Sequence, residues 1–208
     1  MLQQTRETQI LDAAEALFLQ SGLKRITMDD IAELVGVSRP AIYQYFSSKS
    51  DIASMALKRM HQRSLDSVWA AIRQARGLKS QLKAAIEARD GVFLDQRLSA
   101  PVPLWYLDMQ NSWAATEFEK SQAGYQNILR LQLIRSRVHG DEAAIIARLL
   151  VMSAMSLREI ATDPEEFSSE LGSFLSIILE KHLPAGSQTD SDGGGAAGFA
   201  DAASRIVM

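Results

Sequence analysis

The stretch from residue 27 to residue 46, TMDDIAELVGVSRPAIYQYF, constrains the fold of this chain more than any other. It holds two short segments with apolar residues at helical spacing, separated by Gly36-Val37-Ser38. Thr27 is suited to cap the first segment, because its hydroxyl can accept a backbone N–H of the first turn. Gly36 can adopt the left-handed conformation that ends a helix. The spacing therefore predicts a helix-turn-helix.

The second helix of this motif has one apolar side and one polar side. Ser38 is placed to cap it, and Pro40 falls in its first turn, where a missing N–H costs little. Ile42 and Phe46 lie four residues apart and should face the interior. The side chains left outside are polar, aromatic or short, which suits a helix that enters the major groove of DNA. An ordinary helical hairpin is the alternative, because such turns are common.

The residues after this helix favour the DNA-binding interpretation. Ser47-Ser48-Lys49-Ser50-Asp51 starts another helix at once, with a hydroxyl cap and an acid in the first turn. Lys49 would then lie at a helix N-terminus, where an ammonium and backbone N–H groups can bind one phosphate together. The residues predicted to contact DNA are Thr27, Arg39, Pro40, Ala41, Tyr43, Gln44, Tyr45 and Lys49.

Residues 5 to 55 resemble the N-terminal domain of the TetR family of bacterial transcriptional regulators. The resemblance rests on TRETQILDAAEALFLQSG, on Gly36-Val37-Ser38, on Ile42-Tyr43-Gln44-Tyr45-Phe46 and on Ser48-Lys49-Ser50-Asp51. It covers about a quarter of the chain. It implies an all-α fold with an N-terminal three-helix helix-turn-helix domain and a C-terminal helical domain for ligand binding and dimerisation. Family members often carry Gly or Thr where Arg39 and Ala41 stand, so the base preference is open.

The rest of the chain shows helical patterns and no convincing strand. Beyond the motif, helices are expected at about 5–20, 49–75, 79–97, 102–114, 116–137, 141–161 and 165–182. We assign 1–48 to the DNA-binding domain and 49–183 to the regulatory and dimerisation domain. Residues 184–208 are rich in Gly, Ala, Ser and Asp and are predicted to form a flexible low-complexity tail.

Composition favours a globular cytoplasmic protein. The chain has 208 residues, of which 47% are hydrophobic, and it has no cysteine. The lack of cysteine excludes disulfides and thiolate metal sites and agrees with a reducing compartment. No apolar run approaches a membrane span, and the first residues lack the apolar core of a signal peptide. The net charge of −3 does not oppose DNA binding, because basic residues gather around the motif: Lys24, Arg25, Arg39 and Lys49.

Sequence patterns for catalysis are weak. His61, His139 and His182 are far apart, and none is paired with another ligand in a metal-binding spacing. The chain has no nucleophile elbow of the Gly-x-Ser-x-Gly type. We therefore predict no enzyme activity, no metal and no cofactor, although a helical enzyme or a pure interaction domain is kept as a third class.

The last two predicted helices are unusually apolar, which favours an interface. In the resembled family, the two C-terminal helices of each subunit form a four-helix bundle between subunits. That resemblance implies a homodimer here, with contacts from Ile145, Leu149, Met152, Phe167, Leu171, Phe174 and Ile178. A dimer also suits the motif, because two recognition helices about 34–36 Å apart meet successive major grooves of a palindromic site. The alternative is that these helices only close the core of one subunit.

Members of the resembled family commonly bind a small molecule in the C-terminal domain, and binding releases the DNA. Aromatic and methionine residues that could line such a site are Trp69, Phe93, Trp105, Tyr106, Met109, Trp113, Met152 and Met155. Taken singly, each is more often an ordinary core residue. The leading hypothesis is a homodimeric repressor of double-stranded DNA, released from a palindromic operator by an apolar or aromatic inducer. The alternative is a DNA-binding protein without an inducer, acting by DNA occupancy or through a protein partner.

Overall fold

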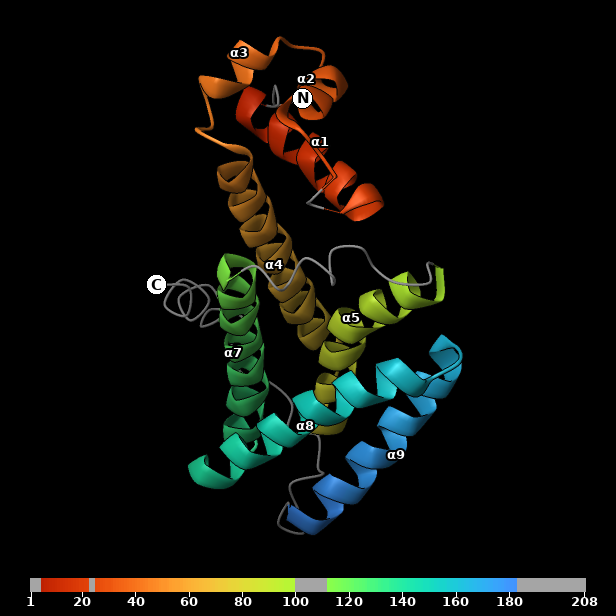
Figure 1. Ribbon diagram of the computed structural model, residues 1–208. Coiled ribbons are helices and arrows are strands. Elements are labelled where there is room, and N and C mark those ends of the chain that lie inside the picture. Colours follow the sequence, from red (N-terminus) through yellow and green to blue (C-terminus); the bar gives the residue numbers. More distant parts are fainter. Residues whose placement is uncertain (1–4, 23–24, 100–111, 183–208) are drawn as a thin grey trace. The chain divides into compact units, whose positions relative to one another are not determined.

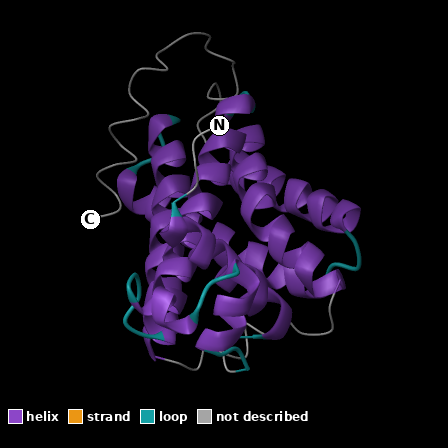
Figure 2. Cartoon of the chain, turned by 90° about the horizontal axis from the view of Figure 1, so that it is seen from above, coloured by secondary structure: helices purple, strands orange, loops and turns teal. Residues whose placement is uncertain are grey.

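The computed structural model of the protein describes residues 5–22, 25–99 and 112–182, and every regular element in these ranges is a helix (Figures 1 and 2). The elements are α1 (Arg6–Ser21), α2 (Met28–Val35), α3 (Arg39–Tyr43), α4 (Lys49–Gln74), α5 (Leu78–Ser99), α7 (Ser112–Arg135), α8 (Gly140–Ile160) and α9 (Pro164–His182). The predicted all-α fold class is confirmed.

Most predicted helices agree with the structure to within a few residues, and one prediction is wrong. A break was expected between helices at 102–114 and 116–137, but α7 runs without interruption from Ser112 to Arg135. The residues at the expected break, Ala114 and Ala115, are strong helix formers with no Gly or Pro beside them. The rest of the predicted helix, to residue 111, and the predicted tail at 184–208 lie outside the described residues.

The described residues divide into two compact units. The first contains α1, α2, α3, the part of α4 up to Arg63 and the start of α7 up to Lys120. The second contains α4 from Ser64, α5 to Leu98, α7 from Ser121, and then α8 and α9. The sequence placed the boundary at 48/49, where α4 begins. The first unit extends further because Ile52, in the first turn of α4, is fully buried in its core.

The core of the first unit is formed by apolar residues of α1, α2, α3, the first part of α4 and the segments that join them. It consists of Ile10, Leu11, Ala14, Phe18, Ile26, Met28, Ile31, Ala32, Ile42, Phe46, Ile52, Ala53 and Ala56. Ion pairs add to this packing between α1 and α4. Glu15, only 7% exposed, pairs with Arg59 at 3.1 Å and also with Arg63. Arg59 pairs with Asp12 as well, so α1 and this part of α4 are joined by both apolar contacts and charges.

The second unit has a larger core, to which each of its helices contributes. Tyr125 of α7 and Phe167 of α9 are among its largest buried side chains. Leu82 and Ile86 of α5 and Leu150 of α8 are also fully or almost fully enclosed. Among the described residues, no helix has a stretch long and apolar enough to cross a bilayer.

Candidate nucleic-acid interface

The start of α2 is fixed by a reciprocal cap. The Thr27 hydroxyl accepts the backbone N–H of Asp30 at 3.2 Å, and the Asp30 carboxylate accepts the backbone N–H of Thr27 at 2.7 Å. This confirms the predicted cap, with an acid completing a capping box. The bond from the Thr27 backbone, followed by that from its hydroxyl, lowers the pKa of Asp30. Because the Thr27 side chain stays exposed, its predicted DNA contact remains open to test.

The turn between α2 and α3 has the geometry that the sequence predicts, apart from one cap. Gly36 is left-handed, with φ 73° and ψ 39°, and its N–H donates to the carbonyl of Glu33 at 3.1 Å. Ser38 occupies the N-cap position of α3, but its hydroxyl makes no capping bond. The reason is local: Pro40 supplies no N–H, and the N–H of Ala41 donates to the backbone carbonyl of Ser38 at 2.9 Å instead.

α3 is anchored by two buried residues and presents the others outward. Ile42 and Phe46 are 0% and 3% exposed, which confirms their predicted place in the core. The residues of the predicted DNA-contact set on this segment are at the surface: Arg39, Pro40, Tyr43, Gln44 and Tyr45 are exposed and Ala41 is half-buried. On α2, Leu34 lies three residues after the fully buried Ile31 but is itself 56% exposed.

Arg39 has partners within the motif. Its guanidinium donates to the Asp29 carboxylate at 3.0 Å and to the Tyr43 hydroxyl at 3.3 Å, and it lies 5.8 Å from the centre of the Tyr43 ring. The Tyr43 hydroxyl and the Asp29 carboxylate together raise the pKa of Arg39. These contacts hold the arginine across the exposed face of α3, while 53% of its side chain stays accessible.

Lys49 has a role that the sequence did not reveal. Its ammonium donates to the backbone carbonyl of Ile26, 2.8 Å away, in the segment that leads into α2. Lys49 thereby ties the start of α4 to the start of the motif. Its neighbours cap α4 as predicted, since the Ser48 hydroxyl accepts the N–H of Asp51 at 3.1 Å. The phosphate contact of Lys49 stays a prediction.

The residues predicted to bind a ligand are only partly described. Trp105, Tyr106 and Met109 lie outside the described residues, and Trp113 lies in α7 with its side chain undescribed. In the second unit, Trp69 and Met155 are half-buried against the core and Phe93 is half-buried on α5. Met152 is 59% exposed and so lies on the surface of the subunit rather than in its core.

Sequence reasoning missed a cluster of charged residues buried in the second unit. Asp90 of α5 accepts a bond from Arg158 of α8 at 3.1 Å and from the Tyr125 hydroxyl of α7 at 3.3 Å. Arg89 stacks over the Tyr125 ring at 4.2 Å, and Arg158 stacks over the Phe93 ring at 4.6 Å. A signal was available, because Asp90 stands four residues from both Ile86 and Leu94 on the apolar face of its helix.

Burial shifts the titration of three members of this cluster. It raises the pKa of Asp90, although Arg89 and Arg158 oppose the shift. It also raises the pKa of Tyr125 well above the ordinary range of a phenol, with the Asp90 charge acting in the same direction. Burial lowers the pKa of Arg89, against the attraction of Asp90. A charged group in this cluster is therefore costly unless an ion pair or a hydrogen bond compensates it.

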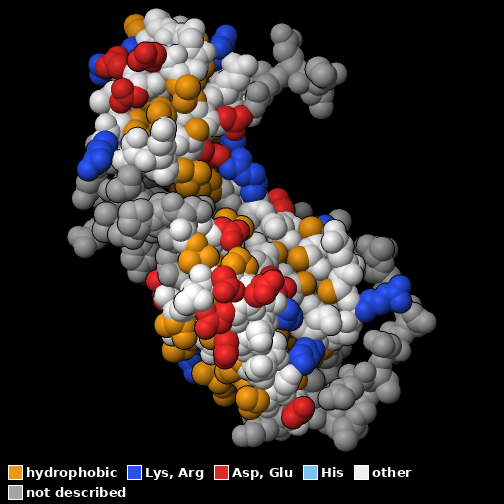
Figure 3. Space-filling view, turned by 90° about the vertical axis from the view of Figure 1, so that its right-hand side faces the viewer, with side chains coloured by type: hydrophobic (Ala, Val, Ile, Leu, Met, Phe, Trp, Pro, Cys, Tyr) orange, Lys and Arg blue, Asp and Glu red, His pale blue; other side chains and the backbone are white. Residues whose placement is uncertain are grey.

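The residues predicted to dimerise fall into two groups. Ile145, Leu149 and Met152 of α8 are 52%, 42% and 59% exposed and form a stripe at helical spacing. Phe174 and Ile178 of α9 are half-buried. Phe167 and Leu171, by contrast, are 2% and 0% exposed in the subunit's own core, because they lie on the face of α9 that closes it. Figure 3 shows hydrophobic side chains at the surface of the second unit, some of them beside acidic ones.

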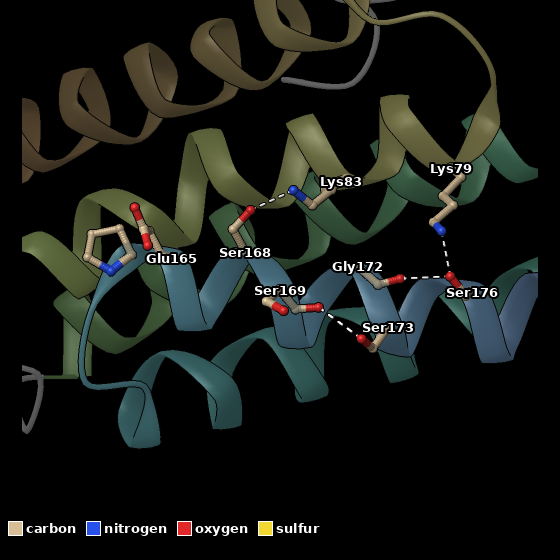
Figure 4. Close-up of a pocket in the computed structure, with 9 residues that line it drawn as sticks. Lys79, Lys83, Glu165, Ser168, Ser169, Gly172, Ser173 and Ser176 are labelled. Carbon is tan, nitrogen blue, oxygen red and sulfur yellow. Dashed lines mark hydrogen bonds between the residues drawn. The ribbon is translucent and has the colours of Figure 1, made fainter.

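A shallow groove in the second unit lies between α5 and α9 (Figure 4). Lys83 donates to Ser168 at 2.6 Å and to Glu87 at 2.8 Å, while Lys79 donates to Ser176. The walls are lysines and serines together with Pro164, Glu165 and Gly172, and none of the predicted ligand-binding residues is among them. The groove is therefore a polar surface feature with its ammonium groups already bonded.

Comparison with known proteins agrees with this geometry. The model of the family described as "Bacterial regulatory proteins, tetR family" matches residues 10–55, which span α1 to the start of α4. The HTH-type transcriptional activator FasR of Mycolicibacterium smegmatis is 37% identical over 83 residues, 40% of this chain. The match spans only 38% of the length of FasR.

Two further comparisons extend beyond the motif. The nucleoid occlusion factor SlmA of Actinobacillus pleuropneumoniae is 26% identical over 152 residues, 70% of this chain and 75% of SlmA. The crystal structure of a TetR-like transcriptional regulator from Rhodococcus sp. RHA1 superposes with a TM-score of 0.63 at 22% identity, covering 86% of this chain and 98% of that one. The likeness to the Rhodococcus structure concerns the fold alone. With the helix-turn-helix geometry and the family match, it leads to one conclusion: residues 10–55 form the helix-turn-helix domain of the TetR family of bacterial regulatory proteins, in a chain with a TetR-like fold.

Proposed function

We propose that this protein is a transcriptional regulator that binds a palindromic operator as a homodimer. The observation that carries the proposal is the exposed face of α3, where Arg39, Tyr43 and Gln44 point away from a core closed by Ile42 and Phe46. Arg39 and Gln44 are side chains that can bond to guanine and adenine edges in the major groove. Tyr43 and Lys49 are suited to phosphate oxygens, which fix the register of the protein on the duplex.

The proposed dimer is supported by the stripe of Ile145, Leu149 and Met152 on α8. Large apolar side chains that line up on one face of a helix suit a second copy of the same surface across a twofold axis. Phe174 and Ile178 of α9 are added to this interface in the proposal, whereas Phe167 and Leu171 are left in the subunit core.

In the proposed mechanism the protein acts as a repressor and a small apolar or aromatic molecule releases it from DNA. Ligand binding in the second unit can lower DNA affinity only if the ligand prefers a conformation that DNA does not. Trp69, Phe93 and Met155 are half-buried there and offer apolar contacts. The relative FasR is named an activator, so the direction of regulation has to be measured.

A second candidate is DNA occupancy without an inducer. The match to SlmA favours it, because that nucleoid occlusion factor aligns with 70% of this chain. In this case the second unit would serve dimerisation and a protein partner, and its core would accept no ligand.

Fluorescence anisotropy with purified protein tests these proposals. Duplexes from the region upstream of the protein's own gene should bind far more tightly than scrambled duplexes of equal length, with affinity falling steeply as salt rises. Equal affinity for both duplexes would overturn the proposed regulator. Apolar compounds that quench tryptophan fluorescence and also weaken the specific complex would support the inducer, whereas quenching without weakening would favour the second candidate.

A further inference from the structure

The buried cluster of the second unit carries more positive than negative charge. Arg89, Asp90 and Arg158 are 4%, 2% and 8% exposed, so two guanidinium groups and one carboxylate are enclosed. A second carboxylate, that of Glu159, pairs with Arg158 at 3.6 Å from the surface, where its side chain is 63% exposed. The carboxylate oxygens of Asp90 accept hydrogen bonds from Arg158 at 3.1 Å and from the Tyr125 hydroxyl at 3.3 Å. An arginine stays protonated in proteins. The cluster therefore keeps an excess positive charge whether Asp90 is ionised or protonated.

Arg89 is the member whose charge is least satisfied. It stacks on the Tyr125 ring at 4.2 Å and feels the neighbouring Asp90, but among the described residues its Nε has no hydrogen-bond partner. A buried N–H without an acceptor is costly, and the cation–π contact of the guanidinium offsets only part of that cost. An unsatisfied buried group in a folded protein calls for an explanation, and a bound partner that supplies the missing acceptor is one.

A second unsatisfied polar group lies on the same face of α7 as Tyr125. The Ser121 hydroxyl, one helical turn earlier, is buried at 5% exposure and has no hydrogen-bond partner among the described residues. The remaining surroundings are apolar, since Leu94 of α5 and Leu129 of α7 belong to the same core. A polar pair inside apolar walls fits a ligand with one polar end and an apolar body.

We propose that Arg89, assisted by Ser121, is a buried subsite for the carboxylate of a small organic acid with an apolar body. The carboxylate accepts N–H bonds from the Arg89 guanidinium and the O–H of Ser121, and the apolar body packs among the core residues. This names the chemical class of the inducer and rests on the proposed ligand-responsive function.

The test compares acids with neutral molecules of the same shape. Octanoate and 1-octanol form one pair of probes, and benzoate and benzyl alcohol form another. Binding to the full chain is followed by tryptophan fluorescence and by the melting temperature, with sodium chloride as a separate inorganic anion. At least one acid should bind tenfold or more tightly than its alcohol. Equal binding within both pairs, or an equal thermal shift from chloride, overturns the proposal.

Two variants separate a ligand subsite from a structural arginine. Arg89→Met removes the charge but keeps an unbranched side chain, so it should abolish the preference for the acid and leave the ligand-free melting temperature unchanged or higher. Arg158→Met is the matched control and should lower that temperature, because it leaves Asp90 without its ion-pair partner. An Arg89→Met protein that melts lower, or that keeps the preference for the acid, assigns Arg89 a structural role and overturns the proposal.

The outcome is independent of the DNA-binding proposal. Wild type and Arg89→Met should both bind the operator duplex specifically when no acid is present. Loss of specific DNA binding by the wild type would refute the proposed regulator, whatever the acids do. Specific DNA binding by a wild type that ignores both acids would refute the subsite alone.

Discussion

At the scale of single residues, the exposed face of α3 depends on how Arg39 is held. Asp29 and the Tyr43 hydroxyl both accept bonds from its guanidinium, at 3.0 and 3.3 Å. Both partners of the ion pair are more than half exposed, so the pair itself adds little stability. In the proposed DNA complex, its more important effect is to restrict where the arginine points before DNA binds, which lowers the entropy lost on binding.

Replacing Arg39 by Ala is therefore expected to alter specificity more than folding. We expect relaxed preference at one base pair in each half-site, with a loss of about 1–3 kcal/mol on the operator if the guanidinium bonds to a guanine. Anisotropy titrations with singly substituted duplexes measure this. Asp29→Asn is the companion variant and should raise affinity for all duplexes, because it removes a negative charge near the phosphates. An equal loss on operator and scrambled DNA would remove Arg39 from the base contacts.

Gly36 gives a prediction about backbone strain alone. A Cβ at this position would meet no atom within 4 Å, so an added methyl group would not clash, but φ is +73°. We expect Gly36→Ala to lower the free energy of unfolding by about 1–2 kcal/mol through left-handed strain. Gly91, inside α5 with equally open surroundings, is the control. Gly91→Ala should stabilise by roughly 0.5–1 kcal/mol in the same urea titration. If both variants changed the free energy of unfolding in the same direction, the assignment of left-handed strain to position 36 would be wrong.

At the scale of elements, helix ends set the geometry of the motif. Thr27 and Asp30 cap α2 reciprocally, and Thr162 with Glu166 forms a similar pair at the start of α9 in the second unit. Hydrogen bonds from each threonine, the backbone N–H first, lower the pKa of the acid. A cap at α2 fixes the direction from which α3 follows, whereas the pair at α9 acts only on the second unit.

We expect Thr27→Ala to lower the free energy of unfolding by about 0.5–2 kcal/mol and to weaken operator binding. Since the pKa of Asp30 is lower in the folded state than in the unfolded state, its contribution is complete above the unfolded pKa. It is lost as the pH falls through the folded pKa. The variant lacks the hydroxyl bond to Asp30 but keeps the backbone bond, so the variant and the wild type should converge in part in acid. Urea titrations over a pH series measure this convergence. Thr162→Ala should keep full operator affinity, and loss of binding there would argue against the local role of the α2 cap.

At the scale of the whole molecule, the proposed function requires two copies of the chain. The stripe of Ile145, Leu149 and Met152 lies on the surface of one subunit. Phe167 and Leu171 of α9, by contrast, are buried in the core of that subunit. A charge placed in the stripe would have to be buried without a partner in a dimer, at high cost, but would stay hydrated in a monomer. The subunit fold should therefore survive a change that separates the two copies.

Leu149→Glu is expected to give a folded monomer that no longer binds the palindromic operator specifically. Sedimentation measures the mass, circular dichroism the helix content, and anisotropy the DNA affinity. Val92→Glu is the control, because Val92 is 53% exposed on α5, outside the stripe, and that variant should remain dimeric. A Leu149→Glu protein with the mass of a dimer would show that the interface lies elsewhere.

The amino-acid sequence by itself determined the helix-turn-helix. Its signals are local: a threonine cap, a glycine that tolerates positive φ, a proline in a first turn, and apolar residues such as Ile42 and Phe46 at helical spacing. Local signals act over one or two turns of helix, so they can be recognised in the sequence without knowing the rest of the fold. The same reasoning located most helices of the second unit.

Only the tertiary structure decided which side chains meet across helices. Two of these contacts join residues that are far apart in the chain: the bond from Lys49 to the carbonyl of Ile26 and the charged cluster around Asp90. A third result is the burial of Phe167 and Leu171, which helical spacing alone did not assign to the core of the subunit or to an interface. Periodicity predicts that a residue faces inward, but not whether it meets its own core or a second subunit. The physical reason is that burial and pairing depend on how the helices pack, and packing is a property of the folded chain as a whole.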